Sequence, residues 1–254
     1  ARRSTRPRPG SGASRSLSRV PMTPSGRPSG DGASQGPPSS YANRYFETRL
    51  APNPHRRAVW RHICAYLERW IPPDAEVLEL GAGWCEFANN VRARRVVAMD
   101  IDSTVERAAR DGVTAVVGDC TDLSGFADGS FDVVFASNLI EHLERPAATA
   151  LLAGARRVLR PGGRLILVQP NFRLDPGRYF DDFTHVAIYT DRSLHDYLVS
   201  EGWEVTPLDP RFLPLTMKAR AASLSFLVPL YLRSPIRPLA GQMLVVAEPA
   251  PEGA

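Results

Sequence analysis

The chain has 254 residues and a formal net charge of +4, which is unevenly distributed. Residues 1–40 contain seven arginines and one acidic residue, whereas residues 41–254 contain 24 basic and 26 acidic side chains. The larger part therefore has no excess of positive charge, which argues against a nucleic-acid-binding protein.

Residues 1–40 are expected to form a disordered basic tail. Ten serines, seven prolines and six glycines occupy 23 of these 40 positions, and such a composition cannot build a core. An organelle transit peptide is the alternative, but the prolines and the lack of an amphipathic period favour disorder. Residues 41–254 are long enough for one sizeable domain.

Hydrophobic periodicity predicts alternating helices and strands from residue 54 onwards. The expected helices cover residues 54–70, 84–92, 103–111, 146–160 and 191–201. The expected strands cover residues 76–80, 95–100, 113–118, 131–136, 164–169, 203–208 and 242–247. Such nearly continuous apolar strands are typical of a parallel sheet that helices cover on both faces.

The segment 223–232 is apolar but is interrupted by Pro229. It has three interpretations, namely a flap over the substrate, a contact in a homodimer, or a helix at a membrane interface. The proline and the modest number of basic residues nearby make the membrane interpretation the weakest. No apolar run reaches the length of a membrane span, so we expect no transmembrane segment.

The three cysteines are Cys64, Cys85 and Cys120. They are odd in number and lack the spacing of a metal site. Reduced thiols and a cytoplasmic protein are therefore expected.

The end of the first expected strand contains the most informative motif. Glu79 and Leu80 run into two glycines one residue apart, Gly81 and Gly83, and Asp100 closes the next strand. Glycines let the backbone turn sharply from strand to helix and come close to a ligand. An acid about 20 residues further on lies where the two hydroxyls of a ribose can be bound. The motif therefore predicts a site for an adenosine-containing cofactor.

Glu86 helps to identify that cofactor. It occupies the third glycine position of a dinucleotide fingerprint, where a carboxylate would repel a pyrophosphate. A cationic cofactor without phosphate fits better, and S-adenosylmethionine has a sulfonium and an amino group that Glu79 and Glu86 can attract. Two alternatives remain: a NAD-dependent oxidoreductase and a non-catalytic cofactor-binding module of the same fold.

Taken in order, the motifs of the chain resemble those of the class I S-adenosylmethionine-dependent methyltransferases, over most of residues 55–250. The matching pieces are Glu79–Gly83, Asp100, Gly118-Asp119-Cys120, Ser137–Leu143 and Arg160–Gly163. This resemblance implies an α/β fold with a doubly wound, Rossmann-like sheet. Its seven strands would be mostly parallel, in the order 3-2-1-4-5-7-6, with the last antiparallel.

The resemblance also assigns roles to residues at the cofactor. Glu79 and the backbone of Gly81 and Gly83 would hold the methionine end, and Asp100 would bind the ribose hydroxyls. The remaining roles fall to Asp119 and the backbone of Cys120 at the adenine edge and to Asn138 at the methyl-donor face. Cys85 stands where the family often has a further glycine.

A looser resemblance links the chain to methyltransferases of bacterial glycan and polyketide-sugar pathways, through Asp181–His185, Leu213–Leu215 and Tyr231–Arg233. It implies a small-molecule acceptor, with oxygen favoured because His185 is a candidate base. His185 follows the fifth strand, where this fold opens onto its ligand, and Asp181 or Asp182 can orient its ring. The alternative is a loop histidine that closes a lid.

His142 follows the fourth strand and also faces this crevice. A role beside the cofactor or in helix packing is favoured over proton abstraction. Asp181, Asp182 and His185 could in principle bind a divalent metal ion, but the sequence shows no third ligand that is firmly anchored. No metal is therefore expected.

Overall fold

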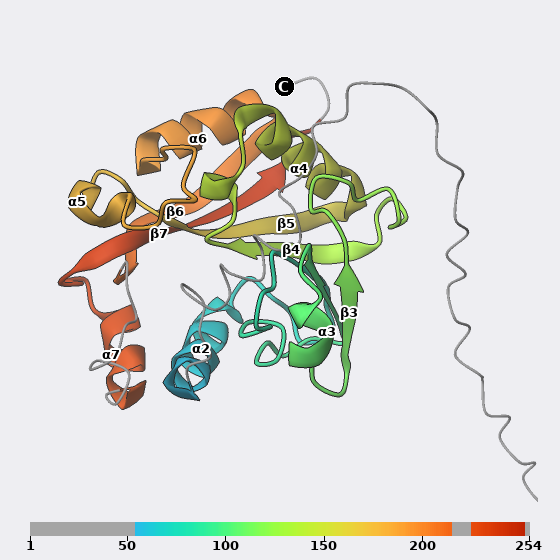
Figure 1. The fold of residues 1–254 in the computed structure, drawn as a ribbon, viewed down its shortest axis with the longest axis horizontal. Coiled ribbons are helices and arrows are strands. Elements are labelled where there is room, and N and C mark those ends of the chain that lie inside the picture. The colour runs from blue at the N-terminus through green and yellow to red at the C-terminus, as the bar shows by residue number, and fades with distance from the viewer. Residues whose placement is uncertain (1–53, 215–224, 252–254) are drawn as a thin grey trace, which may run out of the picture. The chain divides into compact units, whose positions relative to one another are not determined.

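The structure is a computed structural model of the chain and describes residues 54–214 and 225–251 (Figure 1). These residues all lie in one compact unit, Gln35–Ala254. The expected tail at 1–40 lies outside the described residues, as does the start of the apolar segment at 223–224.

The chain alternates between helices and strands, as its hydrophobic pattern predicts. The helices are α2 (Pro54–Leu67), α3 (Thr104–Ala108), the 3-10 helix η1 (Ile140–His142), α4 (Arg145–Val158), α5 (Pro176–Tyr179), α6 (Asp191–Ser200) and α7 (Val228–Arg233). The strands are β1 (Glu76–Leu80), β2 (Arg95–Asp100), β3 (Val113–Val117), β4 (Phe131–Ser137), β5 (Leu159–Pro170), β6 (Trp203–Pro214) and β7 (Ala240–Pro249).

The seven strands form one sheet in the order β3-β2-β1-β4-β5-β7-β6. The pairs from β3 to β5 are parallel, whereas β7 is antiparallel to both β5 and β6. The predicted fold class and strand order are therefore confirmed. Since the chain winds outwards in both directions from β1 and β4, ligands are expected at the carboxyl ends of these strands.

Helices cover both faces of the sheet (Figure 1). Leu78 and its partner Val97 point to the face where α4 and α6 pack, and Ala155 and Leu194 join them in one core cluster. Val77 points to the opposite face, which α2 and α7 cover. This two-sided burial explains why the parallel strands are nearly continuous apolar runs.

The core on the α2 side contains a stack of aromatic rings. Phe87 and Phe135 are stacked with centroids 3.7 Å apart, and the edge of Trp60 meets both rings. Phe87 is fully buried although it belongs to the loop that follows β1. The stack thus anchors that loop to the sheet.

We expect Phe87→Ala to lower the free energy of unfolding by about 3–5 kcal/mol, because it leaves a cavity beside two other rings. Chemical denaturation followed by circular dichroism measures this loss. Phe226→Ala is the matched control, since Phe226 is 67% exposed, and it should change stability by less than about 0.5 kcal/mol. Equal stability of the two variants would contradict the anchoring role.

The helix expected over 84–92 is wrong, because residues 84–90 form consecutive turns. The side chain of Glu79 explains part of this difference: its Oε2 accepts the backbone N–H of Ala88 at 2.9 Å. A regular helix would direct that N–H to the carbonyl of Trp84. Cys85 also has a φ of 53°, in the left-handed region that a helix excludes.

Candidate functional site

The glycines after β1 are required by their backbone conformation and by their neighbours. Gly81 and Gly83 have φ values of 68° and 51°, in the region that side chains disfavour. A Cβ on Gly81 would lie only 2.9 Å from Cδ1 of Leu139. The turn after β1 therefore packs tightly against the segment that follows β4.

Asp100, at the end of β2, is tied to this turn. Its Oδ2 accepts the backbone N–H of Gly83 at 2.7 Å, and its Oδ1 accepts that of Asp102 at 2.9 Å. Burial raises the pKa of Asp100, against these two hydrogen bonds. Each carboxylate oxygen keeps a further lone pair, so the group can accept hydrogen bonds from two ribose hydroxyls. The geometry fits an adenosine-containing cofactor.

Glu79, in β1, adds a second buried carboxyl group to the site. Burial raises its pKa well above the ordinary value, despite the hydrogen bond from Ala88, and the charges of Asp100 and Glu86 raise it further. Neighbouring carboxylates of this kind are stabilised by a cation and repel a phosphate. The acidic lining fits the sulfonium and amino groups of S-adenosylmethionine better than a pyrophosphate.

Glu79→Gln should separate the effect of this buried charge on the stability of the fold from its effect on cofactor affinity. An acid whose folded-state pKa is raised makes the fold less stable at high pH, and this penalty disappears as the pH falls from the folded-state pKa to the unfolded-state pKa. We therefore expect the variant, without cofactor at neutral pH, to unfold at the same or a higher temperature than the original protein. Its affinity for S-adenosylmethionine should fall, which calorimetry would show. A lower unfolding temperature together with unchanged affinity would contradict both expectations.

The other predicted cofactor residues surround the same edge of the sheet. Asp119 follows β3, is exposed, and accepts a hydrogen bond from Thr121 through Oδ1. Cys120 is half-buried beside it. Asn138 follows β4 with a φ of 50°, and its side-chain oxygen accepts a hydrogen bond from Gln242. All of these residues stand at the carboxyl ends of strands, where the fold places its ligand.

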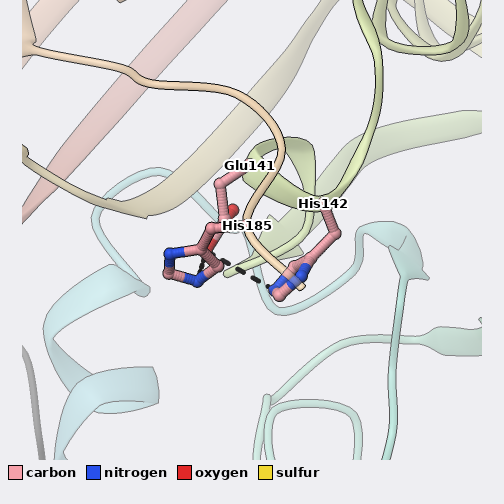
Figure 2. A group of neighbouring side chains, drawn as sticks. All are labelled: Glu141, His142 and His185. Carbon is pink, nitrogen blue, oxygen red and sulfur yellow. Dashed lines mark ion pairs between the residues drawn. The ribbon is translucent and has the colours of Figure 1, made fainter. Parts of the chain in front are cut away.

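A second group of side chains comes from η1, which follows β4, and from the loop between α5 and α6 (Figure 2). Glu141 is fully buried, and Nε2 of His142 and Nε2 of His185 each lie 3.9 Å from its Oε1. Backbone hydrogen bonds from Val186 and Ala187 to the Glu141 carbonyl hold the two loops together. Burial raises the pKa of Glu141 to about 8 and lowers that of His142.

Asp182, and not Asp181, is the aspartate that belongs to this group. Its Oδ1 accepts hydrogen bonds from the backbone and the hydroxyl of Thr184, and the same hydroxyl lies 2.8 Å from Nδ1 of His142. Burial alone would raise the pKa of Asp182, but these bonds together with the neighbouring His142 and His185 lower it. Asp181 is exposed. The structure thus brings the candidate catalytic residues His185 and Asp182 into one group with His142.

Sequence reasoning missed Glu141 and Thr184 as members of this group. Glu141 was part of a family motif, but only the structure shows that its carboxyl group is buried between two imidazoles. A signal was present in the sequence, since Glu141 is an acid close behind the apolar strand 131–136. Ligands of such folds bind outside the carboxyl ends of the parallel strands, so an acid at that edge is a candidate member of the site.

A cavity of about 590 Å³ opens at the opposite edge of the sheet, beside Asp132 and Arg160. Its cations are paired with acids, since Arg160 Nη1 lies 2.7 Å from Asp132 Oδ2 and Arg94 Nη2 lies 2.7 Å from Glu76 Oε1. We therefore place the functional site at the carboxyl edge. Among the described residues, no helix is long and apolar enough to cross a membrane.

Comparison with known proteins also indicates a cofactor-binding enzyme of this fold. Residues 78–167 match the model of a methyltransferase domain. The chain is 33% identical over 175 residues to the malonyl-[acyl-carrier protein] O-methyltransferase of Methylococcus capsulatus, a match that covers 62% of each protein. It thus spans less than two thirds of this relative.

A longer match is to the ubiquinone/menaquinone biosynthesis C-methyltransferase of Dinoroseobacter shibae. The two proteins are 30% identical over 195 residues, which cover 66% of this chain and 74% of the relative. The fold resembles a solved S-adenosylmethionine-dependent methyltransferase of Thermotoga maritima, described as a possible histamine N-methyltransferase, with a TM-score of 0.57 and 19% identity. That alignment covers 84% and 97% of the two chains.

These matches, like the acidic lining of the glycine turn, favour S-adenosylmethionine over a nicotinamide dinucleotide. The predicted sheet order and the predicted cofactor agree with them. The chain belongs to the class I S-adenosylmethionine-dependent methyltransferases, and S-adenosylmethionine is its cofactor.

Proposed function

We propose that the enzyme methylates an oxygen of a small-molecule acceptor, such as a glycan or secondary-metabolite precursor. The main observation in favour is the group of Glu141 and His142 in η1 with Asp182 and His185 in the loop between α5 and α6. A hydroxyl acceptor must lose a proton, and this group supplies both imidazoles and carboxylates for that purpose.

In this proposal the two halves of the site have separate tasks. Glu79, Asp100 and Asp119 bind and orient the cofactor, which supplies a methyl group on a sulfonium sulfur. His185 accepts the hydroxyl proton while the acceptor oxygen forms its bond to the methyl carbon. The carbon–sulfur bond breaks with its electron pair going to sulfur, and S-adenosylhomocysteine is released. Because charge is dispersed in this transition state, a partly dry site favours it.

Asp182 and Thr184 act as positioning residues in this scheme. Through the Thr184 hydroxyl, Asp182 fixes the ring of His142, which packs against that of His185 with centroids 4.8 Å apart. Much of the rate would come from holding the acceptor oxygen in line with the methyl group, which replaces a bimolecular encounter.

A turnover assay tests the proposal. The full chain is incubated with S-adenosylmethionine and three acceptor classes: a malonyl thioester, hydroxylated sugars and a quinol. We expect S-adenosylhomocysteine together with an O-methyl product, identified by mass spectrometry and NMR. A product methylated at carbon or nitrogen would refute oxygen specificity. Tight cofactor binding without turnover on any acceptor would instead favour the non-catalytic binding module.

The predicted homodimer contact through 223–232 stays a prediction. Residues 225–232 are described, and Phe226 and Leu230 are both exposed there. The predicted division into a tail (1–40) and one methyltransferase domain (41–254) also stays a prediction.

A further inference from the structure

The surroundings of Glu141 are unusual for a carboxyl group. Its side chain has no exposed surface, and among the described residues no other residue donates a hydrogen bond to Oε1 or Oε2, so the N–H of Glu141 itself is the one backbone group that acts on this carboxyl. A buried polar group without a partner costs about 1–3 kcal/mol, and more when it is charged. Such a group calls for an ion, a proton or a water molecule as its partner.

The hydrogen bonds of His142 show which of its two ring nitrogens bears the hydrogen and which bears the lone pair. The Thr184 hydroxyl has one hydrogen, which it donates to the Asp182 carboxylate at 2.6 Å. The Thr184 oxygen, 2.8 Å from His142 Nδ1, must therefore accept a hydrogen bond from that nitrogen. The Thr184 carbonyl, 3.3 Å from Nδ1, can also only accept. In the neutral ring Nε2 then bears the lone pair, and it faces Glu141.

Nε2 of His142 and Oε1 of Glu141 thus face each other, and the distance between them is too long for a hydrogen bond. Nε2 of His142 lies 3.9 Å from Glu141 Oε1, and Nε2 of His185 lies 3.9 Å from the same oxygen. Hydrogen bonds between such atoms are about 2.7–3.2 Å long. Ligand atoms bound at about 2.0–2.2 Å to one metal ion, by contrast, lie about 3–4 Å from each other. The three donor atoms are all within 4.8 Å of one another.

We propose that Glu141, His142 and His185 bind one divalent transition-metal ion, with Zn²⁺ as the reference case (Figure 2). Two imidazoles and one carboxylate with an open fourth position are the ligands of catalytic zinc sites. The chain from His142 through Thr184 to Asp182 corresponds to the carboxylate that orients a metal-binding histidine through its other nitrogen. The His142 side chain is 21% exposed, so the fourth position can open on its side.

The role of the ion rests on the proposed function. An acceptor hydroxyl bound at the open position would have a lowered pKa, would release its proton to solvent, and would then attack the methyl carbon. His185 would serve as a ligand in this state, and the ion would replace it as the group that activates the acceptor. The metal-free base described above is the competing outcome.

Metal binding can be measured without any acceptor. The full chain is freed of metal with a chelator and titrated with Zn²⁺ by calorimetry, and with Co²⁺ by its visible absorption. We expect one ion per chain in the original protein. Glu141→Gln and His185→Gln should each weaken binding by at least about 100-fold. Thr184→Val, which removes only the orienting hydroxyl, should weaken it by about 10–100-fold.

His195→Ala is the matched control, because His195 lies on α6 and is paired with Asp196 outside the group. It should leave Zn²⁺ affinity unchanged. If Glu141→Gln fails to fold, His185→Gln and Thr184→Val test the same site.

Two results would overturn the metal site. One is the absence of Zn²⁺ binding to the original protein, and methyl transfer that continues in chelator would then leave the proposed function intact. The second result is that the original protein binds one ion and all three variants bind it equally well, which would mean that the ion is bound outside this group. Conversely, an ion lost in the variants, with no acceptor turned over, would support the metal site and refute the proposed function.

Discussion

Asp100→Ala should weaken the binding of S-adenosylmethionine by at least about 100-fold while the protein remains folded. Each hydrogen bond from a ribose hydroxyl to this carboxylate is charge-assisted and is worth about 1.5–3 kcal/mol. Losing two of them costs about 3–6 kcal/mol, and each 1.4 kcal/mol is about a tenfold change in affinity. Isothermal titration calorimetry with the cofactor measures the change directly.

The same substitution also removes two internal hydrogen bonds, from Gly83 and Asp102, and a control must account for this. Asp122→Ala is suitable, because Asp122 is exposed and accepts the backbone N–H of Ser124 in a similar short turn. It should leave cofactor affinity unchanged. If Asp100→Ala binds the cofactor as tightly as Asp122→Ala does, Asp100 has no role at the ribose.

The sheet could be predicted because its strands are specified locally. Val77 to Leu80, apolar except for Glu79, and Val96 to Met99 have the length of a buried strand, and the turns between elements have clear glycine and proline signals. Boundaries were less accurate, since β5 extends back to Leu159 through Pro161-Gly162-Gly163. Pairing with β4 near Phe131 accounts for that extension, and pairing between strands is not visible in a single run of sequence.

The cofactor half of the site could also be predicted, because its residues follow directly after strands. Gly81, Asp100 and Asn138 each stand at a strand end, and parallel strands bring such positions to one edge. The irregular turns of 84–90 could not be predicted in the same way. They depend on a long-range contact, the hydrogen bond from the Ala88 backbone to Glu79, which competes with a helix that the local pattern favours.

The acceptor half depended on contacts between two distant loops. His142 and His185 are 43 positions apart in the sequence. The loop of 182–187 meets η1 through backbone hydrogen bonds to the Glu141 carbonyl and through side-chain contacts with Glu141 and His142. Hydrophobic periodicity does not predict a contact between two distant loops. The sequence therefore indicated His185 and Asp182 as candidates but left them without Glu141, the buried group that both imidazoles face.

His185→Ala should lower turnover by about 10²–10⁴-fold, the usual effect of losing a proton-transfer residue. Cofactor affinity should stay unchanged, because the proposed cofactor contacts come from β1, β2, β3 and Asn138. A radiolabelled or coupled assay for S-adenosylhomocysteine gives the rate, and calorimetry gives the affinity. The control His195→Ala, on the exposed face of α6, should keep full activity. Equal turnover in the two variants would leave positioning alone as the source of the rate.

The same variant separates the two possible roles of His185 when it is compared with metal-free protein. If His185 acts only as a ligand, removing the metal from the original protein should lower turnover about as much as His185→Ala does, and Zn²⁺ should restore only the original protein. If His185 is itself the base, chelation should leave the rate of the original protein unchanged, and the variant should be slow with or without Zn²⁺. The role of His185, whose ring lies against those of Tyr179 and His142, is thus decided by the turnover rates of the original protein and the variant, each measured with and without metal.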